Sequence, residues 1–210
     1  MAGPADPAGA PGNVTGGIPG AAVPSRRRPR ALAGWAVAVA VALLLALGIR
    51  AFVLQAFSIP SSSMEPTLDV GDRILVWKAF FNWHDVGQGD IVVFTRPPLD
   101  HCGGPPDEYL VKRVIALPGQ AIYSAGNAVY VDGRRLPERY LPPGERLGPQ
   151  IPAATRQAPF HVPAGEFYVM GDNRPVSCDS RFWGPIRGTT IVGRAVLLLW
   201  HHGHPDLRPF

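Results

Sequence analysis

The feature that most limits how this chain can fold is an uncharged apolar stretch of 19 residues, Ala31 to Ile49. As an α-helix rising about 1.5 Å per residue, the stretch would span about 28 Å, close to the thickness of a membrane's hydrocarbon core. Trp35 lies near one end, where aromatic side chains are common at the membrane interface. The sequence therefore predicts a single transmembrane helix over residues 31–50.

The residues around this stretch predict its orientation. A cleaved secretory signal also begins with basic residues, but its apolar region is usually shorter and is followed by a small-x-small cleavage site. Here Arg50 and the bulky sequence AFVLQAF follow, which favours an uncleaved anchor. The basic sequence RRRPR precedes the stretch, so we expect residues 1–30 on the cytoplasmic side and everything after Arg50 outside the cytoplasm.

Residues 1–30 also explain the chain's positive charge. They are almost all Ala, Gly and Pro before the arginines and cannot bury a core, so they predict a disordered tail. Four of the chain's arginines lie in this tail, and they account for most of the formal net charge of +4. A nucleic-acid binder needs its basic surplus on the folded part, so the composition argues against nucleic acid as a partner.

Residues 51–200 predict a mainly β domain built on antiparallel sheet. Runs rich in β-branched and aromatic residues, such as RILVW, DIVVFT and EYLVKRVIAL, alternate with Gly and Pro turns. Asp132-Gly133 between two extended runs indicates a hairpin, and no helical periodicity recurs after the apolar stretch. We expect residues 138–165 to be an irregular insertion and residues 201–210 to be a polar C-terminal tail.

The segment IPSSSMEPTL, residues 59–68, places three consecutive serines between prolines, which indicates a held loop rather than a flexible linker. A serine hydroxyl becomes a useful nucleophile only when a base removes its proton. His161 with Asp172 could complete a Ser-His-Asp triad, but such loose pairs arise by chance at this length. His201, His202 and His204 could bind a metal ion, although a solvated tail is the favoured interpretation.

Lysine is the other candidate base. Only Lys78 and Lys112 are present among twenty basic residues, and arginine cannot lose its proton near neutral pH. Lys112 lies among apolar residues in EYLVKRVIAL, a setting that would lower the pKa of its amine. On spacing alone, a lysine snorkelling from the open face of a strand is the simpler interpretation. Lys78 is expected to be an ordinary surface lysine.

Four sequence blocks in order resemble those of bacterial type I signal peptidases, membrane-anchored Ser/Lys proteases that remove signal peptides. The blocks are SSSMEPTL, GDIVVF, YLVKRVIALPG and VPAGEFYVMGDNRPVSCDSRFWGPI, and the apolar stretch occupies the position of the family's anchor. One block would be weak, but four in order are specific. The resemblance implies an extracytoplasmic serine endopeptidase in the bacterial cell membrane that uses no cofactor and no metal ion.

The resemblance implies a role for each polar residue of these blocks. Ser63 would be the nucleophile and Lys112 its general base. Ser61 would donate a hydrogen bond to the oxyanion, and Ser177 would orient the lysine. The supporting charge network would comprise Asp172, Asp179 and Arg181, for which structural ion pairing is the favoured interpretation.

The resemblance also implies the substrates, exported preproteins with small residues at the first and third positions before the cut. Shallow apolar pockets for these residues would be lined by Phe57, Ile59, Met64, Leu68, Leu110 and Val111. The same residues would be ordinary core in any β domain. The lipid bilayer is a further implied partner, and we expect a monomer.

The chain has only two cysteines, Cys102 and Cys178, both on the expected extracytoplasmic side. A disulfide between them would connect a Pro- and Gly-rich segment, residues 96–107, to the neighbourhood of Ser177. Two free buried thiols are an equally good interpretation, because the sequence does not show proximity.

Two other functions remain open from the sequence. A related Ser/Lys peptidase could cleave only itself or one dedicated partner, although such enzymes are usually soluble. A membrane-anchored β-domain scaffold could bind envelope proteins without any chemistry. Cleavage of an exported precursor, self-cleavage alone and no cleavage would distinguish the three.

Overall fold

The computed structural model describes residues 29–78, 81–103, 109–144 and 150–210. The chain divides into two units, Met1–Ala42 and Leu43–Phe210. Nearly all of the predicted disordered tail, residues 1–30, lies outside the described residues.

The predicted transmembrane segment falls within helix α1, Pro29–Phe52, which is 24 residues long. Among the described residues, we find no helix that is both long enough and apolar enough to cross a membrane. The transmembrane helix over residues 31–50 therefore stays a prediction.

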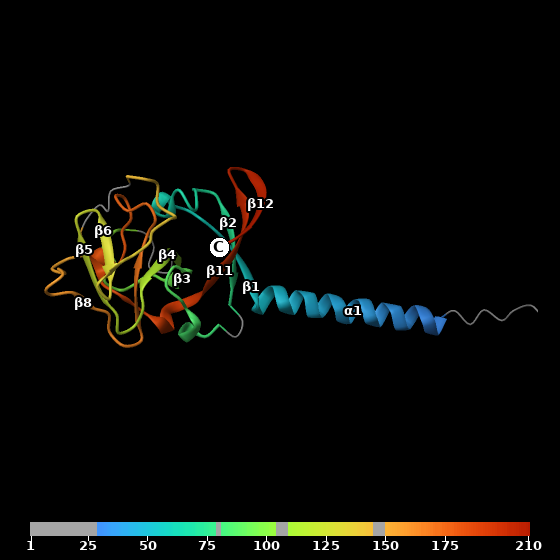
Figure 1. Ribbon diagram of the computed structural model, residues 1–210. Helices are drawn as coiled ribbons and strands as arrows, with labels where there is room; N and C mark the ends of the chain where they lie inside the picture. Colours follow the sequence, from blue (N-terminus) through green and yellow to red (C-terminus); the bar gives the residue numbers. More distant parts are fainter. Residues whose placement is uncertain (1–28, 79–80, 104–108, 145–149) are drawn as a thin grey trace, which may run out of the picture. The chain divides into compact units, whose positions relative to one another are not determined.

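The second unit confirms the predicted mainly β, antiparallel fold. Its larger sheet has eight strands in the order β1-β2-β11-β3-β4-β9-β10, with β12 paired to β11 (Figure 1). The strands are β1 (Leu54–Ser58), β2 (Arg73–Trp77), β3 (Ile91–Thr95), β4 (Tyr109–Ala116), β9 (Glu166–Met170), β10 (Ile186–Arg187), β11 (Ile191–His201) and β12 (His204–Pro209). All pairings are antiparallel.

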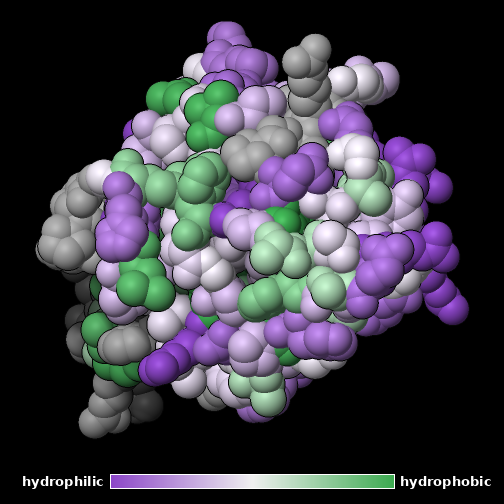
Figure 2. Space-filling view, turned by 90° about the vertical axis from the view of Figure 1, so that its left-hand side faces the viewer, coloured by the Kyte–Doolittle hydropathy of each residue, from purple (hydrophilic) through white to green (hydrophobic). Residues whose placement is uncertain are grey.

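A smaller antiparallel sheet has four strands in the order β7-β6-β5-β8. These are β5 (Ala121–Ala125), β6 (Ala128–Val131), β7 (Arg134–Arg135) and β8 (Phe160–His161). The hairpin predicted at Asp132-Gly133 joins β6 to β7, and both residues have positive φ, as a two-residue hairpin turn requires. Seen from the end of the domain that carries this sheet, hydrophilic residues predominate, with small apolar groups between them (Figure 2).

Short helices lie in the connections: η1 (Ser62–Met64), η2 (Trp83–Asp85), α2 (Ser180–Trp183) and η3 (Gly188–Thr190). Three buried apolar clusters support the sheets. One of them lies under η1 and includes Met64, Leu68 and Ile74. The nucleophile loop predicted from the sequence is therefore anchored on a packed core.

The C-terminal residues differ from the expected tail. His204–Pro209 form β12, which pairs with the end of β11 through His201↔His204. The two turn residues, His202 and Gly203, both have positive φ, the backbone that a tight hairpin requires. The sequence concealed this hairpin because histidine, unlike Asn or Asp, is not a usual first residue of such a turn.

Residues 138–165, the expected insertion, carry one short strand, β8, among their described residues. Ile151 and Ala154 from this segment are buried in the core of the small sheet. The segment is therefore irregular in backbone but packed against the domain where it is described.

Candidate active site

Ser63 lies in η1, at the top of a loop that is closed at its base. The backbone N–H of Ile59 donates to Asp72 O and that of Gly71 donates to Ile59 O, both at 2.9 Å. Between these points, Met64 is only 1% exposed and Leu68 is fully buried. The loop thus presents Ser63 on a rigid support rather than on a flexible linker.

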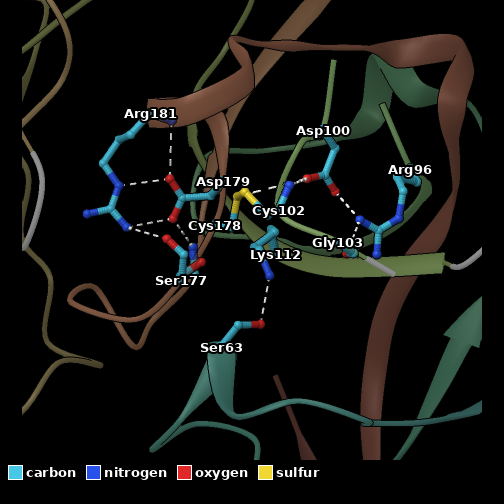
Figure 3. Close-up of a disulfide and its surroundings, with 11 residues drawn as sticks. Ser63, Arg96, Asp100, Cys102, Gly103, Lys112, Ser177, Cys178, Asp179 and Arg181 are labelled. Atoms are coloured by element: carbon cyan, nitrogen blue, oxygen red, sulfur yellow. Dashed lines mark hydrogen bonds and ion pairs between the residues drawn. A yellow bond between two sulfur atoms is a disulfide. The ribbon is translucent and has the colours of Figure 1, made fainter. Parts of the chain in front are cut away.

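Lys112 lies on β4, an inner strand of the large sheet with β3 and β9 on either side. The side chain is buried, with 3% of its surface exposed, so it does not snorkel from an open face. Its Nζ donates a hydrogen bond of 2.7 Å to Ser63 Oγ (Figure 3). The contact joins the loop before β2 to an inner strand, between two residues that are 49 positions apart in the sequence.

Ser61 and Ser63 are also in contact. Ser61 precedes η1 as its N-cap residue but makes no side-chain capping bond. Its hydroxyl instead donates to Ser63 Oγ at 3.2 Å, on the exposed side of the loop. A second hydroxyl therefore lies beside the oxygen that Lys112 contacts.

Ser177 borders this pair but does not make the hydrogen bond expected from the sequence. It is 2% exposed, and its Oγ has no hydrogen-bond partner within the described ranges. A Cβ placed on Gly171 would lie 2.2 Å from Ser177 Oγ and 2.3 Å from Ser63 O. Only glycine at position 171 allows these segments to approach so closely.

Asp172 takes part in an ion pair, but its partner is one that the sequence did not indicate. Arg113 Nε and Nη2 donate to its two carboxylate oxygens at 2.9 and 2.6 Å, and Thr67 Oγ1 donates to it at 2.6 Å. Arg113 follows Lys112 on β4, so its side chain leaves the strand on the opposite face. The carboxylate is thus occupied, and His161, on β8 of the small sheet, does not form the alternative triad with it.

Asp179 and Arg181 form the other buried pair of the expected network. Arg181 donates to both oxygens of Asp179, at 2.8 and 2.7 Å, and both side chains are fully buried (Figure 3). Asp179 also accepts the backbone N–H of Gly171 at 3.0 Å. The pair therefore fixes the backbone that packs against Ser63.

Asn173 contacts the loop directly and was missed at the sequence level. Its backbone N–H donates to Ser63 O at 3.1 Å and its side-chain amide donates to Ser62 O at 3.0 Å. The only sequence signal was its place in the GDNR motif.

Residues at the start of the insertion brace the same segment and were also missed. Arg174 is fully buried, forms an ion pair with Glu138 and donates to Tyr140 Oη at 3.0 Å. Burial raises the pKa of Tyr140 above its ordinary value, so its phenol stays neutral. The Arg113 guanidinium lies over the Tyr140 ring, 4.0 Å from the centroid.

The six residues expected to line substrate pockets divide by burial. Ile59, Met64 and Leu68 are at most 2% exposed and belong to the core cluster under η1, together with Val111. Phe57 packs against that cluster and is partly exposed, whereas Leu110 packs against a different one. Of the six, Phe57 and Leu110 present the most surface.

Cys102 and Cys178 form a disulfide, which resolves the alternatives left open by the sequence (Figure 3). Their Cα atoms are 6.3 Å apart and 76 positions separate them in the sequence. The bond connects the segment after β3, which contains Cys102, to the segment that contains Ser177, because Cys178 directly follows that serine.

Comparisons with known proteins show the family of this chain. Residues 32–200 match the model of the family described as signal peptidase, peptidase S26. This chain belongs to that family. It is 41% identical to signal peptidase I of Leptolyngbya laminosa over 165 residues, covering 77% of this chain and 76% of the relative. It is 43% identical to the probable signal peptidase I-1 of Synechocystis sp. over 159 residues, covering 74% of this chain and 76% of the relative.

Among solved structures, a signal peptidase I from Enterococcus faecalis is 26% identical, with a TM-score of 0.42, covering 52% of this chain and 96% of that one. Membership of the signal peptidase family identifies the chain as a serine peptidase.

Proposed function

We propose that this chain is a membrane-anchored serine endopeptidase that removes N-terminal signal peptides from exported preproteins after small-x-small sites. Ser63 is the nucleophile and neutral Lys112 is its general base. The observation that carries the proposal is the 2.7 Å contact between Lys112 Nζ and Ser63 Oγ, made by a lysine that is 3% exposed.

Burial is what lets a lysine act as the base. An ammonium group loses favourable hydration when it is buried, so a buried lysine gives up its proton more readily near neutral pH than an exposed one. In the neutral form, the Ser63 hydroxyl donates its proton to Nζ along the same short contact. The geometry meets the requirement that nucleophile and base be within hydrogen-bonding distance.

In the acylation step, Ser63 Oγ attacks the scissile carbonyl carbon while its proton passes to Lys112 Nζ. The carbonyl oxygen becomes an oxyanion, which accepts hydrogen bonds from the Ser61 hydroxyl and the Ser63 backbone N–H. A single oxyanion donor is typically worth about 3 kcal/mol of barrier. The C–N bond then breaks, the Lys112 ammonium protonates the departing amine, and an acyl-enzyme ester on Ser63 remains.

In the second step, water replaces the departed amine. Neutral Lys112 takes a proton from the water as its oxygen attacks the ester carbonyl, and the ammonium returns that proton to Ser63 Oγ as the ester bond breaks. The signal peptide leaves as a carboxylate. Ser177 and the ion pairs of Asp172 and Asp179 act on this chemistry indirectly, by holding the segment that packs on Ser63.

Substrate selection rests on the apolar surroundings of Ser63. Phe57 offers apolar surface to an extended substrate, with Ile59, Met64, Leu68 and Val111 packed in the cluster behind it. Leu110 offers further apolar surface beside a different cluster. A pocket with a packed floor accepts small side chains and excludes large ones, which agrees with cleavage after small-x-small sequences.

The anchor and the localisation are part of the proposal. Residues 31–49 carry no charge and lie within one continuous helix, and RRRPR precedes them. A cytoplasmic N-terminus would place the β domain outside the cytoplasm, beside the outer leaflet of the membrane. The lipid bilayer is then a partner of a monomeric enzyme whose substrates are themselves still held in the membrane.

The test uses the full chain in detergent micelles and a purified exported precursor with a small-x-small site. We expect discrete cleavage after that site, lost in Ser63→Ala and in Lys112→Ala while circular dichroism shows both variants folded. Self-cleavage without precursor cleavage would indicate a dedicated peptidase instead. No cleavage by the folded enzyme would leave the scaffold function.

A further inference from the structure

Four side chains with metal-binding chemistry meet where the β11–β12 hairpin (red in Figure 1) contacts the turn at residues 69–72. His201 Nδ1 lies 2.7 Å from Asp72 Oδ2, and His201 Nε2 lies 3.9 Å from Asp69 Oδ2. His202 Nδ1 lies 3.2 Å from the same Asp69 oxygen. None of these residues takes part in the proposed peptidase chemistry.

The hairpin turn is what brings two consecutive histidines to one side. Neighbouring residues of a strand point to opposite faces, so His201 and His202 would normally diverge. The positive φ of His202, 49°, turns its side chain back toward that of His201. The two ring centroids are 3.9 Å apart as a result.

Asp72 holds the orientation of the His201 ring. Its side chain is almost fully buried, and its position is fixed because it also accepts the backbone N–H of Asp69 at 2.8 Å. With Nδ1 facing this carboxylate, Nε2 is the ring nitrogen that faces Asp69. Its distance of 3.9 Å from Asp69 Oδ2 is too long for a hydrogen bond and leaves room for a cation between the two atoms.

The distances suit a zinc ion. Tetrahedral coordination with bonds of about 2.0–2.1 Å places ligand atoms about 3.3 Å from one another. Asp69 Oδ2 lies 3.2 Å from His202 Nδ1 and 3.9 Å from His201 Nε2, on either side of this value. All three candidate ligand atoms lie within 4.8 Å of one another. Two imidazole nitrogens favour zinc over calcium or magnesium, which prefer oxygen.

We propose that Asp69, His201 and His202 form a zinc-binding site, with Asp72 orienting His201 and water filling the fourth position. A carboxylate behind a metal-bound histidine is a common outer-shell arrangement in zinc proteins. The bound ion would tie the C-terminal hairpin to the turn at Asp69–Asp72. That turn closes the loop that carries Ser63, through the backbone bonds between Ile59 and residues 71 and 72.

The test is isothermal titration calorimetry of zinc chloride into the full chain, stripped with EDTA and carrying no polyhistidine tag, in detergent. We expect one zinc ion per chain and a higher Tm with zinc than without. In His202→Ala, whose side chain is 70% exposed and not needed for packing, we expect at least a tenfold loss of affinity and a smaller Tm shift. Asp72→Asn should weaken zinc binding about 10- to 100-fold.

His204→Ala is the matched control, because His204 lies in the same exposed hairpin but outside the cluster. It should bind zinc as the unchanged chain does. The proposal is overturned if the unchanged chain binds zinc with a Kd above about 100 µM. Equal affinity in His202→Ala, or an equal loss in His204→Ala, would overturn it as well.

Discussion

In the proposed mechanism, the amine of Lys112 must lie close to Ser63 and must lose its charge readily. The inner position of β4 favours both conditions, since the side chain is 3% exposed and its Nζ is 2.7 Å from the hydroxyl. Arg113, the next residue, points to the other face and holds Asp172. The two adjacent basic residues therefore have different partners, and in the proposed mechanism only Lys112 must be able to deprotonate.

The first prediction compares Lys112→Arg with Lys112→Ala. Both variants should lose at least about 10³-fold in turnover of a precursor, because arginine keeps its proton and alanine has no base. The measurement is single-turnover cleavage followed by gel electrophoresis. Lys78→Arg is the control and should retain activity, since the Lys78 amine donates a hydrogen bond of 2.7 Å to Gln55 and does not contact Ser63. Near-normal turnover by Lys112→Arg would rule out lysine as the base.

The second prediction concerns the pH dependence of kcat/KM. Burial disfavours the ammonium form, so the basic group that controls the rate should titrate well below the ordinary lysine pKa of about 10.4. The rate should fall as the pH decreases through this pKa, because protonated Lys112 cannot accept the Ser63 proton. A profile that keeps rising to pH 10 would show an ordinary lysine and contradict the neutral-base mechanism.

At the scale of elements, the site depends on one loop packing against another. The turn Gly171–Asn173 follows β9 and bonds to η1 through Asn173, while Asp179 holds its backbone from behind. Sequence reasoning indicated both segments as blocks but not their contact, because 111 positions separate Asn173 from Ser62. It also named Asp172 without its partner Arg113, since an ion pair across a sheet leaves no local pattern.

The third prediction is that Gly171→Ala inactivates the enzyme. The added Cβ would lie 2.3 Å from Ser63 O, so the loop that carries Ser63 has to shift. We expect a loss of more than tenfold in kcat and a destabilisation of about 1–3 kcal/mol, measured by urea unfolding. Gly87→Ala is the control, because a Cβ there would meet only Asp90 Oδ2 at 3.7 Å. Normal kcat in Gly171→Ala would show that the close approach is not needed.

At the scale of the whole molecule, the runs of β-branched residues between turns correctly predicted a mainly β antiparallel domain. The prediction of a C-terminal tail over residues 201–210 was wrong, because the turn His202-Gly203 closes the β11–β12 hairpin. Histidine is not a usual first residue of such a turn, so the sequence did not indicate it. The disulfide could not be chosen from the sequence, because two cysteines 76 positions apart carry no information about their distance. Long-range contacts of this kind are decided by the whole fold.

The fourth prediction concerns that disulfide. Closing so long a loop restricts the unfolded chain, and the loop-entropy model gives about 4 kcal/mol of stabilisation, which other effects can reduce. Cys102→Ser with Cys178→Ser should lower the urea midpoint, and Cys102→Ser alone should lower it similarly. Mass spectrometry after alkylation without reductant should find no modified cysteine in the unchanged protein. Two alkylated thiols in the native protein would contradict the bond.

Ser63 and Lys112 are far apart along the chain, and this decides when the contact between them can form. Lys112 reaches Ser63 Oγ from β4, which lies between β3 and β9 in the sheet, and β9 begins only at Glu166. We expect a chain that has not yet paired β9 with β4 to lack this contact and therefore the proposed activity. In the proposed mechanism, folding of the domain is therefore the step that creates the catalytic pair.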